Sequence, residues 1–172
     1  GTTVMGYGVV QAVKRGLVVR QYGVIRLSQY SGHALKLKKI FERVSQLIDD
    51  YLPDEMAVEA PFYGKNVQSM LKLGRAQGVA LAAALTREIP VMEYAPSKVK
   101  QAVTGHGGSS KEQVASMLHA VLQFGDPSEH IMLDATDALA VAVCHFHQGR
   151  LPQGNSAKSW GDFLKANPGR VR

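Results

Sequence analysis

Hydrophobic and polar positions alternate along the chain in two rhythms, with a period near two at the start and near 3.6 further on. Apolar residues on both sides of a Lys-Arg-Gly turn at positions 14–16 predict a β-hairpin over residues 6–22. Residues 23–27 predict a third extended piece. Apolar residues spaced i, i+3, i+4 and i+7 then predict an amphipathic helix over residues 37–51, which Pro53 ends.

The rest of the chain alternates short apolar strands with longer helices. We expect strands at residues 56–58 and 90–94, and helices over 66–87, from 96 to a glycine-rich break at 105–108, from a cap at Ser109 or Ser110 to about 124, and over 133–147. Asn66 is a candidate N-cap. Strands that come first and then alternate with helices indicate an α/β domain with a mixed sheet, in which a meander precedes β-α-β crossovers.

A length of 172 residues fits one ordinary domain, which we place at residues 1–149. Residues 150–172 are rich in Gly, Pro, Lys and Arg and predict a flexible basic tail. No apolar run approaches the roughly 18 residues of a membrane span, and residues 1–4 show no signal-peptide pattern. The single cysteine, Cys144, excludes an internal disulfide and a multi-cysteine zinc site and favours a reducing cytoplasm.

The charge balance is the first indication of a partner. Twenty Lys and Arg residues against fourteen Asp and Glu residues give a net charge of +6 and an isoelectric point near 9.5. A moderately basic domain of this size often binds a polyanion such as nucleic acid, but many proteins with the same balance bind none.

Three carboxylates are the candidates for chemistry. Glu59 ends an apolar strand, where open α/β sheets place their sites. Asp134 and Asp137 are three residues apart on the last helix and therefore share one face. These residues also have ordinary structural explanations. Glu59 can be a charged residue that simply follows a strand, and Asp134 and Asp137 can be acids that cap a helix N-terminus. The competing interpretation is a hard-cation site, in which the carboxylates hold Mg²⁺ and the metal holds a phosphate.

A stripe of small residues runs along the helix predicted over residues 66–87. Gly74, Gly78 and Ala82 recur every four residues, and each glycine within a helix costs about 1 kcal/mol relative to alanine. Such a stripe indicates close packing against a neighbour, which is either the sheet of this chain or a second copy of it.

Five segments together resemble the RuvC-type Holliday-junction resolvases. The resemblance lies in residues 1–9 (GTTVMGYGV), 57–66 (AVEAPFYGKN), 71–78 (LKLGRAQG), 94–100 (YAPSKVK) and 134–140 (DATDALA), in the family's order and spacing. It implies a ribonuclease-H-like fold, a mixed five-stranded sheet flanked by helices. It also implies a homodimer that cuts four-way DNA junctions symmetrically, in recombination and repair, to leave ends that a ligase can seal.

The resemblance also implies the role of each site residue. Glu59, Asp134 and Asp137 match the catalytic, metal-binding acids, which would hold two Mg²⁺ ions, with Mn²⁺ as a substitute. Phe62 matches an aromatic residue that stacks on bases at the junction centre. Lys100 and Lys111 match two basic positions that face the cut DNA backbone. Weaker candidates for the same DNA-binding surface are Lys65, Lys98, Lys72 and Arg75. Gly74 and Gly78 match the family's dimer interface.

The sequence departs from the family at its start. The family's first catalytic Asp and the strand that precedes it come before the position of Gly1, so we expect the given sequence to be incomplete there. The resemblance further implies a branch-migration motor complex as a partner, a cytoplasmic, nucleoid-associated location and no membrane partner.

Three other functions remain open at this point. If the first acid is truly absent from the protein, the chain would be a junction-binding protein that does not cleave. An actin-like or sugar-kinase ATPase shares the Gly-Thr-Thr turn but needs two such domains and a much longer chain. A general ribonuclease H shares the fold and the metals, but it does not explain the segment around Phe62.

Overall fold

Two strand pairs and five helices make up the part of the chain that the computed structural model describes, which is residues 3–14, 16–61, 66–124 and 133–150. Strand β1 (Val4–Val13) pairs antiparallel with β2 (Gly16–Arg26), and β3 (Met56–Glu59) pairs parallel with β4 (Val91–Tyr94). The helices are α1 (His33–Tyr51), α2 (Val67–Leu85), α3 (Pro96–Thr104), α4 (Lys111–Leu122) and α5 (Leu133–Arg150). The α/β class predicted from the order of elements is confirmed.

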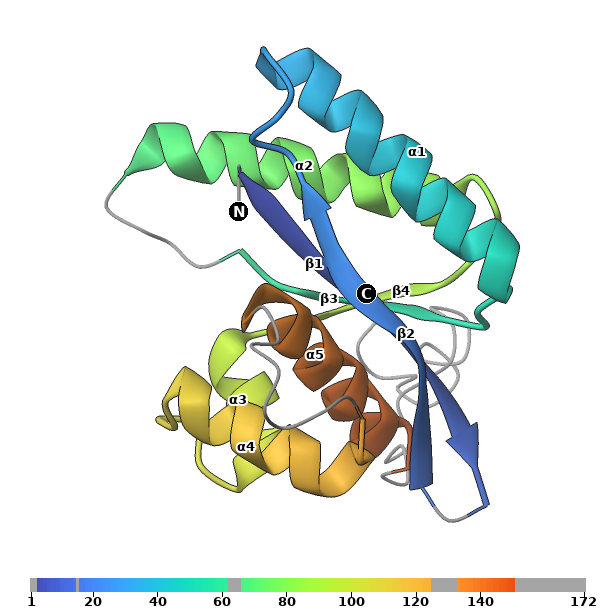
Figure 1. Cartoon of the computed structure of the whole chain (residues 1–172), viewed down its shortest axis with the longest axis vertical. Coiled ribbons are helices and arrows are strands. Elements are labelled where there is room, and N and C mark those ends of the chain that lie inside the picture. The colour runs from blue at the N-terminus through green and yellow to red at the C-terminus, as the bar shows by residue number, and fades with distance from the viewer. Residues whose placement is uncertain (1–2, 15, 62–65, 125–132, 151–172) are drawn as a thin grey trace, which may run out of the picture.

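The helices cover the strands from two sides (Figure 1). Helices α1 and α2 pack on one face, where Met5 and Tyr7 of β1 join their core. Helices α3, α4 and α5 pack on the other face, where Val10 joins a second core that includes the fully buried Leu139. Successive strand residues point to opposite faces, so one strand supplies both cores. The result is a helix–strand–helix sandwich.

Strand β2 is longer than the sequence predicts. Residues 23–27 are not a separate extended piece, because Gly23 and Ile25 continue the β1–β2 ladder opposite Tyr7 and Met5. The register shifts at Val9 and Val10, which leaves Arg20 as the extra residue of a β-bulge on β2.

Within the described residues the strands form two pairs, whereas the family resemblance implies one mixed sheet of five strands. No ladder joins β1–β2 to β3–β4 within the described residues. Helix α5 contacts all four strands and so bridges the two pairs from one face. The described residues supply no strand between the two pairs, so backbone hydrogen bonds do not connect them.

Local capping fixes the ends of the helices near the candidate acids. Asn66 caps α2 as predicted, since its Oδ1 accepts a 3.1 Å hydrogen bond from the Ser69 amide. Ser110 rather than Ser109 caps α4, in a capping box with Gln113. Ser109 instead bonds to the Thr104 hydroxyl and closes the turn between α3 and α4. Lys111 therefore becomes the first residue of α4.

None of the described helices combines the length and the hydropathy that a membrane crossing requires.

A bidentate ion pair links α1 to the turn that follows α2. The Nε and Nη2 atoms of Arg87 donate to the two carboxylate oxygens of Asp49, at 2.7 and 2.9 Å, and these bonds lower the pKa of Asp49. A lowered pKa in the folded state means that the pair stabilises the fold above the pKa of the unfolded chain. This contribution is lost as the pH falls through the folded pKa.

We therefore expect Asp49→Asn to lower the Tm at neutral pH, with a gap to the wild type that closes as the pH falls below about 3.9, the ordinary pKa of Asp. Thermal unfolding followed by circular dichroism over this pH range measures the gap. Asp50→Asn is the matched control, because Asp50 is an exposed neighbour for which the described residues show no ion pair. A gap that stays constant with pH would refute the assignment.

Candidate active site

Glu59 is held at the carboxyl end of β3 by bonds on both of its sides. It lies opposite Tyr94 in the parallel ladder, and the amide of the next residue, Ala60, donates to the Tyr94 carbonyl at 2.8 Å. From α2, the Gln77 side chain donates to the Glu59 carbonyl at 3.4 Å and to the Glu93 carboxylate at 3.2 Å. Pro61 lacks the backbone N–H that a ladder needs, so β3 ends at Glu59 and the Glu59 carboxylate lies at the carboxyl end of the strand.

Two glycines in β1 set the position of α5 and therefore of the two aspartates. A Cβ atom on Gly6 would overlap the carbonyl oxygen of Asp134, and one on Gly8 would lie 2.7 Å from Cδ2 of Leu139. Helix α5 can lie this close to β1 because both glycines lack a side chain. This contact fixes the N-terminal end of α5, where Asp134 lies in the first turn and Asp137 follows it.

Lys111 brings a positive charge to this helix end. Its Nζ lies 2.5 Å from Oδ2 of Asp137, and both side chains remain partly exposed to solvent. The hydrogen bond to Asp137 is the largest cause that raises the pKa of Lys111, and the charges of Asp137, Asp134 and Glu59 raise it further. Lys111 thus interacts with all three predicted acids.

The acids also interact with one another. Partial burial is the largest cause that raises the pKa of Glu59, and the negative charge of Asp137 raises it further. The positive charges of Lys111 and Lys100 act in the opposite direction. Glu59, Asp134, Asp137, Lys100 and Lys111 therefore form one electrostatic cluster, which we call the acid site. Such a mixture of carboxylates and lysines can hold a cation together with a phosphate.

The acid site has the donor chemistry of a hard-cation site but not a closed cage. Its possible ligands are carboxylate oxygens, which Mg²⁺ and similar ions prefer. Glu59 and Asp137 come from different elements, and their negative charges repel each other. A cation bound between them would relieve this repulsion. In the described part of the chain, however, no three Asp, Glu, His or Cys side chains are close enough together to hold a metal ion. Asp137 is bonded to Lys111 instead. The residues fit a metal in chemistry and charge, and the metal site stays a prediction.

The other predicted site residues lie in different surroundings. Phe62 and Lys65 fall outside the described residues, as do residues 151–172 of the predicted tail. Lys98 lies with its Nζ 5.5 Å from the centre of the Tyr94 ring, and its charge is not among the causes that shift the pKa of Glu59. Only Lys100 and Lys111 of the predicted DNA-binding lysines therefore reach the acids in the described residues.

The glycines of α2 face open space. A Cβ atom on Gly74 or Gly78 would meet no described atom within 4 Å, so packing against the sheet of the same chain does not explain the stripe. Helix α2 buries its opposite side, through Ala76, Ala80, Ala83 and Ala84. The uncovered side is a continuous row at helical spacing. It consists of Val67, Leu71, Gly74, Gly78, Ala82 and Leu85, and we call it the α2 stripe.

Two contacts that hold β3 in place have no signal in the sequence. Gln77 ties α2 to the Glu59 strand end. His145 connects three elements, because its Nδ1 bonds to the Tyr94 hydroxyl at 2.8 Å and its Nε2 to the Glu55 carboxylate at 2.7 Å. Its partners are 51 and 90 residues away along the chain, so no local pattern could have indicated them.

The helix–strand–helix sandwich, with acids at a strand end and at the N-terminus of a facing helix, places the chain in the ribonuclease-H-like class, to which the solved structures of similar fold belong. The family model described as "Crossover junction endodeoxyribonuclease RuvC" matches residues 1–145. The chain belongs to this family.

Curated relatives and solved structures agree with this assignment. The protein named crossover junction endodeoxyribonuclease RuvC from Cytophaga hutchinsonii is 57% identical over 175 residues, which cover 100% of this chain and 84% of the relative. Its namesake from Porphyromonas gingivalis is 55% identical and is covered to 93%. The structure of Thermus thermophilus RuvC in complex with a Holliday junction substrate matches with a TM-score of 0.78 and 32% identity. That match covers 87% of this chain and 90% of the other.

Proposed function

We propose that this chain is a metal-dependent endonuclease that cuts four-way DNA junctions at the acid site. The observation that carries the proposal is the electrostatic cluster of Glu59, Asp137 and Lys111, which joins a strand end to two helix N-termini. Membership in the family and the likeness to a protein solved with a Holliday junction support the substrate. Binding without cleavage is less favoured, because the relatives are named endodeoxyribonucleases.

Glu59, Asp134 and Asp137 would hold the metal, for which we propose Mg²⁺, two ions per site, with Mn²⁺ as a substitute. When bound, the metal would lower the pKa of the attacking water and stabilise the charge that develops on the phosphate. Lys111 would then be released from Asp137 to contact a backbone oxygen of the cut strand. Lys100, whose charge already acts on Glu59, would hold the same strand in place.

The remaining predicted DNA contacts belong to the same proposal. Phe62 and Lys65 follow Glu59 in the sequence, so a base stacked on Phe62 would lie near the cut phosphate, with about 1–3 kcal/mol from stacking. Lys98 would add a more distant backbone contact. The resemblance also supports a branch-migration motor complex as a partner, and a chromosomal substrate supports a cytoplasmic, nucleoid-associated location.

We further propose that two copies associate through the α2 stripe. Val67, Leu71 and Leu85 are between 58% and 65% exposed, which is unusual for large apolar residues on one helix face. Gly74 and Gly78 lie at the centre of the row and would let a second α2 approach closely. Two symmetrical cuts in one junction require two acid sites, so a dimer with twofold symmetry suits the substrate.

We expect Gly78→Arg to weaken self-association by at least about tenfold, because a long charged side chain would occupy the centre of the contact. The monomer itself should fold normally, since open space surrounds Gly78 and arginine favours helix more than glycine. Sedimentation velocity over a range of concentrations measures the change. Gln68→Arg, an exposed position of α2 outside the stripe, adds the same charge and should leave association unchanged. A wild-type protein that stays monomeric would refute the dimer.

Cleavage of a synthetic four-way junction with and without Mg²⁺, beside a linear duplex of the same sequence, tests the proposed function. We expect paired symmetrical cuts in the junction only, and only with the metal. Tight junction binding without cuts would refute cleavage by this chain and support the alternative of a binding protein. Preferred cutting of RNA–DNA hybrids would favour a general ribonuclease H.

A further inference from the structure

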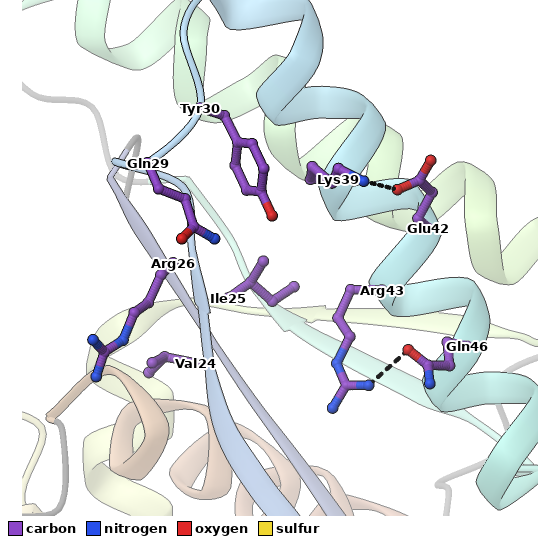
Figure 2. A pocket seen from close by; sticks show the side chains of 9 residues that line it. All are labelled: Val24, Ile25, Arg26, Gln29, Tyr30, Lys39, Glu42, Arg43 and Gln46. Atoms are coloured by element: carbon purple, nitrogen blue, oxygen red, sulfur yellow. Dashed lines mark hydrogen bonds and ion pairs between the residues drawn. The ribbon is translucent and has the colours of Figure 1, made fainter.

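An open groove of about 420 Å³ lies along the outer edge of β2, where this strand faces α1 (Figure 2). We call it the edge groove, and its polar lining consists of Arg26, Gln29, Tyr30, Lys39, Glu42, Arg43 and Gln46. Val24 and Ile25 form part of its apolar lining. Strand β2 has only β1 as a neighbour in the described residues, so its other edge is free to face a ligand.

The groove carries an excess of positive charge. Three cations and one carboxylate, Glu42, line it, and Glu42 is already paired with Lys39 at 2.7 Å. Arg43 is held in place, because it donates to Gln46 at 2.8 Å and to the Tyr7 hydroxyl at 2.9 Å. Arg26 is exposed and has no ion pair or hydrogen bond from its guanidinium to another described residue. The two arginines flank the same strand edge from opposite faces of the strand pair, and the unpaired guanidinium of Arg26 suits the oxygens of a phosphate.

The groove lies close to the acid site. Arg26 is opposite Val4 in the ladder, and Val24 is opposite Gly6, which contacts Asp134. Residues opposite each other share a face, so Arg26 is on the face of the strand pair that carries α5. In Figure 2 Arg26 and the α1 side chains Arg43 and Gln46 lie on different sides of β2. Strand spacing and rise place the Cα atoms of Gly6 and Arg26 roughly 8 Å apart.

We propose that the edge groove binds backbone phosphates of the junction outside the cut site, with Arg26 as its principal contact. This inference rests on the proposed function, since it needs DNA at the acid site. A nucleic acid strand has one phosphate per 3.4 Å of helix rise, so a strand held at the acids reaches Arg26 within a few nucleotides. Arginine, lysine and amide donors without a base-reading element fix the position of DNA rather than its sequence.

The salt dependence of binding tests this proposal, because each phosphate contact adds about 0.9 to the slope of log K against log salt concentration. The full chain is titrated with a four-way junction without divalent metal, between about 50 and 200 mM salt. We expect Arg26→Gln to lower the slope by about 0.9, so that over this range it loses about 3.5-fold less affinity than the wild type. Arg26→Lys should keep the slope, and Lys39→Gln should lower it.

Lys38→Gln is the matched control for Lys39→Gln. It removes one cation from the same helix, α1, at a position that does not line the groove. Its slope should equal that of the wild type. An unchanged slope for Arg26→Gln, or an equal loss for Lys38→Gln, would overturn the proposal. If Arg26→Gln does not fold, an unchanged slope for Lys39→Gln overturns it in the same way. Failure of the wild type to cut junctions with Mg²⁺ would instead refute the proposed function, whatever the slopes.

Discussion

Glu59→Gln should reduce the rate of junction cleavage at least about 10²-fold while junction binding stays intact, since a loss of this size is typical when one charge-stabilising group is removed. The amide keeps the size of the side chain but loses the negative charge that a hard cation needs. Binding should be equal or slightly tighter, because one fewer carboxylate faces the phosphates beside Asp137. Single-turnover cleavage with Mg²⁺ and fluorescence anisotropy without it measure the two quantities separately.

Glu55→Gln is the control for this experiment. It makes the same substitution directly before β3, at the end opposite Glu59, where the carboxylate bonds to His145 rather than to the acid site. It should cut within a few-fold of the wild type, with a small loss of stability at most. Equal cleavage by Glu59→Gln and the wild type would remove Glu59 from the site. A large loss in both variants would mean that β3 as a whole, and not one carboxylate, is sensitive to substitution.

Features that depend on residues close in sequence could be predicted without the structure. The apolar spacing of α1, the Asn66 cap and the serine cap of α4 each follow from a few adjacent positions, and all three are confirmed. Residues 23–27 are predicted as a separate extended piece rather than as part of β2, because pairing with β1, and not local propensity, continues the strand to Arg26. The ladder runs without a break from Tyr22 to Gly23, which lie opposite Gly8 and Tyr7 of β1.

The acid site was predictable as a set of residues but not as an arrangement. Strand-end position and helical spacing, together with the resemblance, select Glu59, Asp134 and Asp137. The interaction of Lys111 with Asp137 depends on how α4 and α5 pack, and no local pattern predicts it because the two residues are 26 positions apart in the sequence. The position of Arg26 near the acid site was equally unpredictable. It depends on the pairing of Arg26 with Val4, two residues before Gly6, which contacts Asp134.

The α2 stripe shows how a structure can decide between alternatives that a sequence leaves open. Small residues at four-residue spacing predict close packing but do not identify the neighbour. The open space around Gly74 and Gly78 removes the sheet of the same chain as that neighbour. Two helical glycines cost about 2 kcal/mol relative to alanine, a cost that no contact in the described residues offsets. A second copy of the chain remains the neighbour that we propose, and the Gly78→Arg experiment tests it.

Gly6→Ala should damage both stability and cleavage, although it adds only one methyl group. Its Cβ would overlap the backbone carbonyl of Asp134, and a backbone atom cannot move aside as a side chain can. Overpacking of this kind typically costs 1–3 kcal/mol and occasionally more. Relief requires α5 to move away from β1, and this displaces Asp134 and Asp137 relative to Glu59. Catalytic groups tolerate little displacement, so we expect the cleavage rate to fall about 10²-fold.

Gly8→Ala separates displacement of the acids from a general loss of packing. Its Cβ would meet Cδ2 of Leu139 at 2.7 Å, the end of a side chain that can rotate, one helical turn beyond Asp134. Chemical denaturation should show a smaller loss for Gly8→Ala than for Gly6→Ala, and cleavage should be nearly unchanged at a temperature where both variants are folded. If the two variants lose cleavage in proportion to their stability, the contact of Gly6 with Asp134 supports the fold only. If Gly6→Ala loses far more cleavage than its stability explains, then the close approach of α5 to β1 is what aligns the aspartates with Glu59.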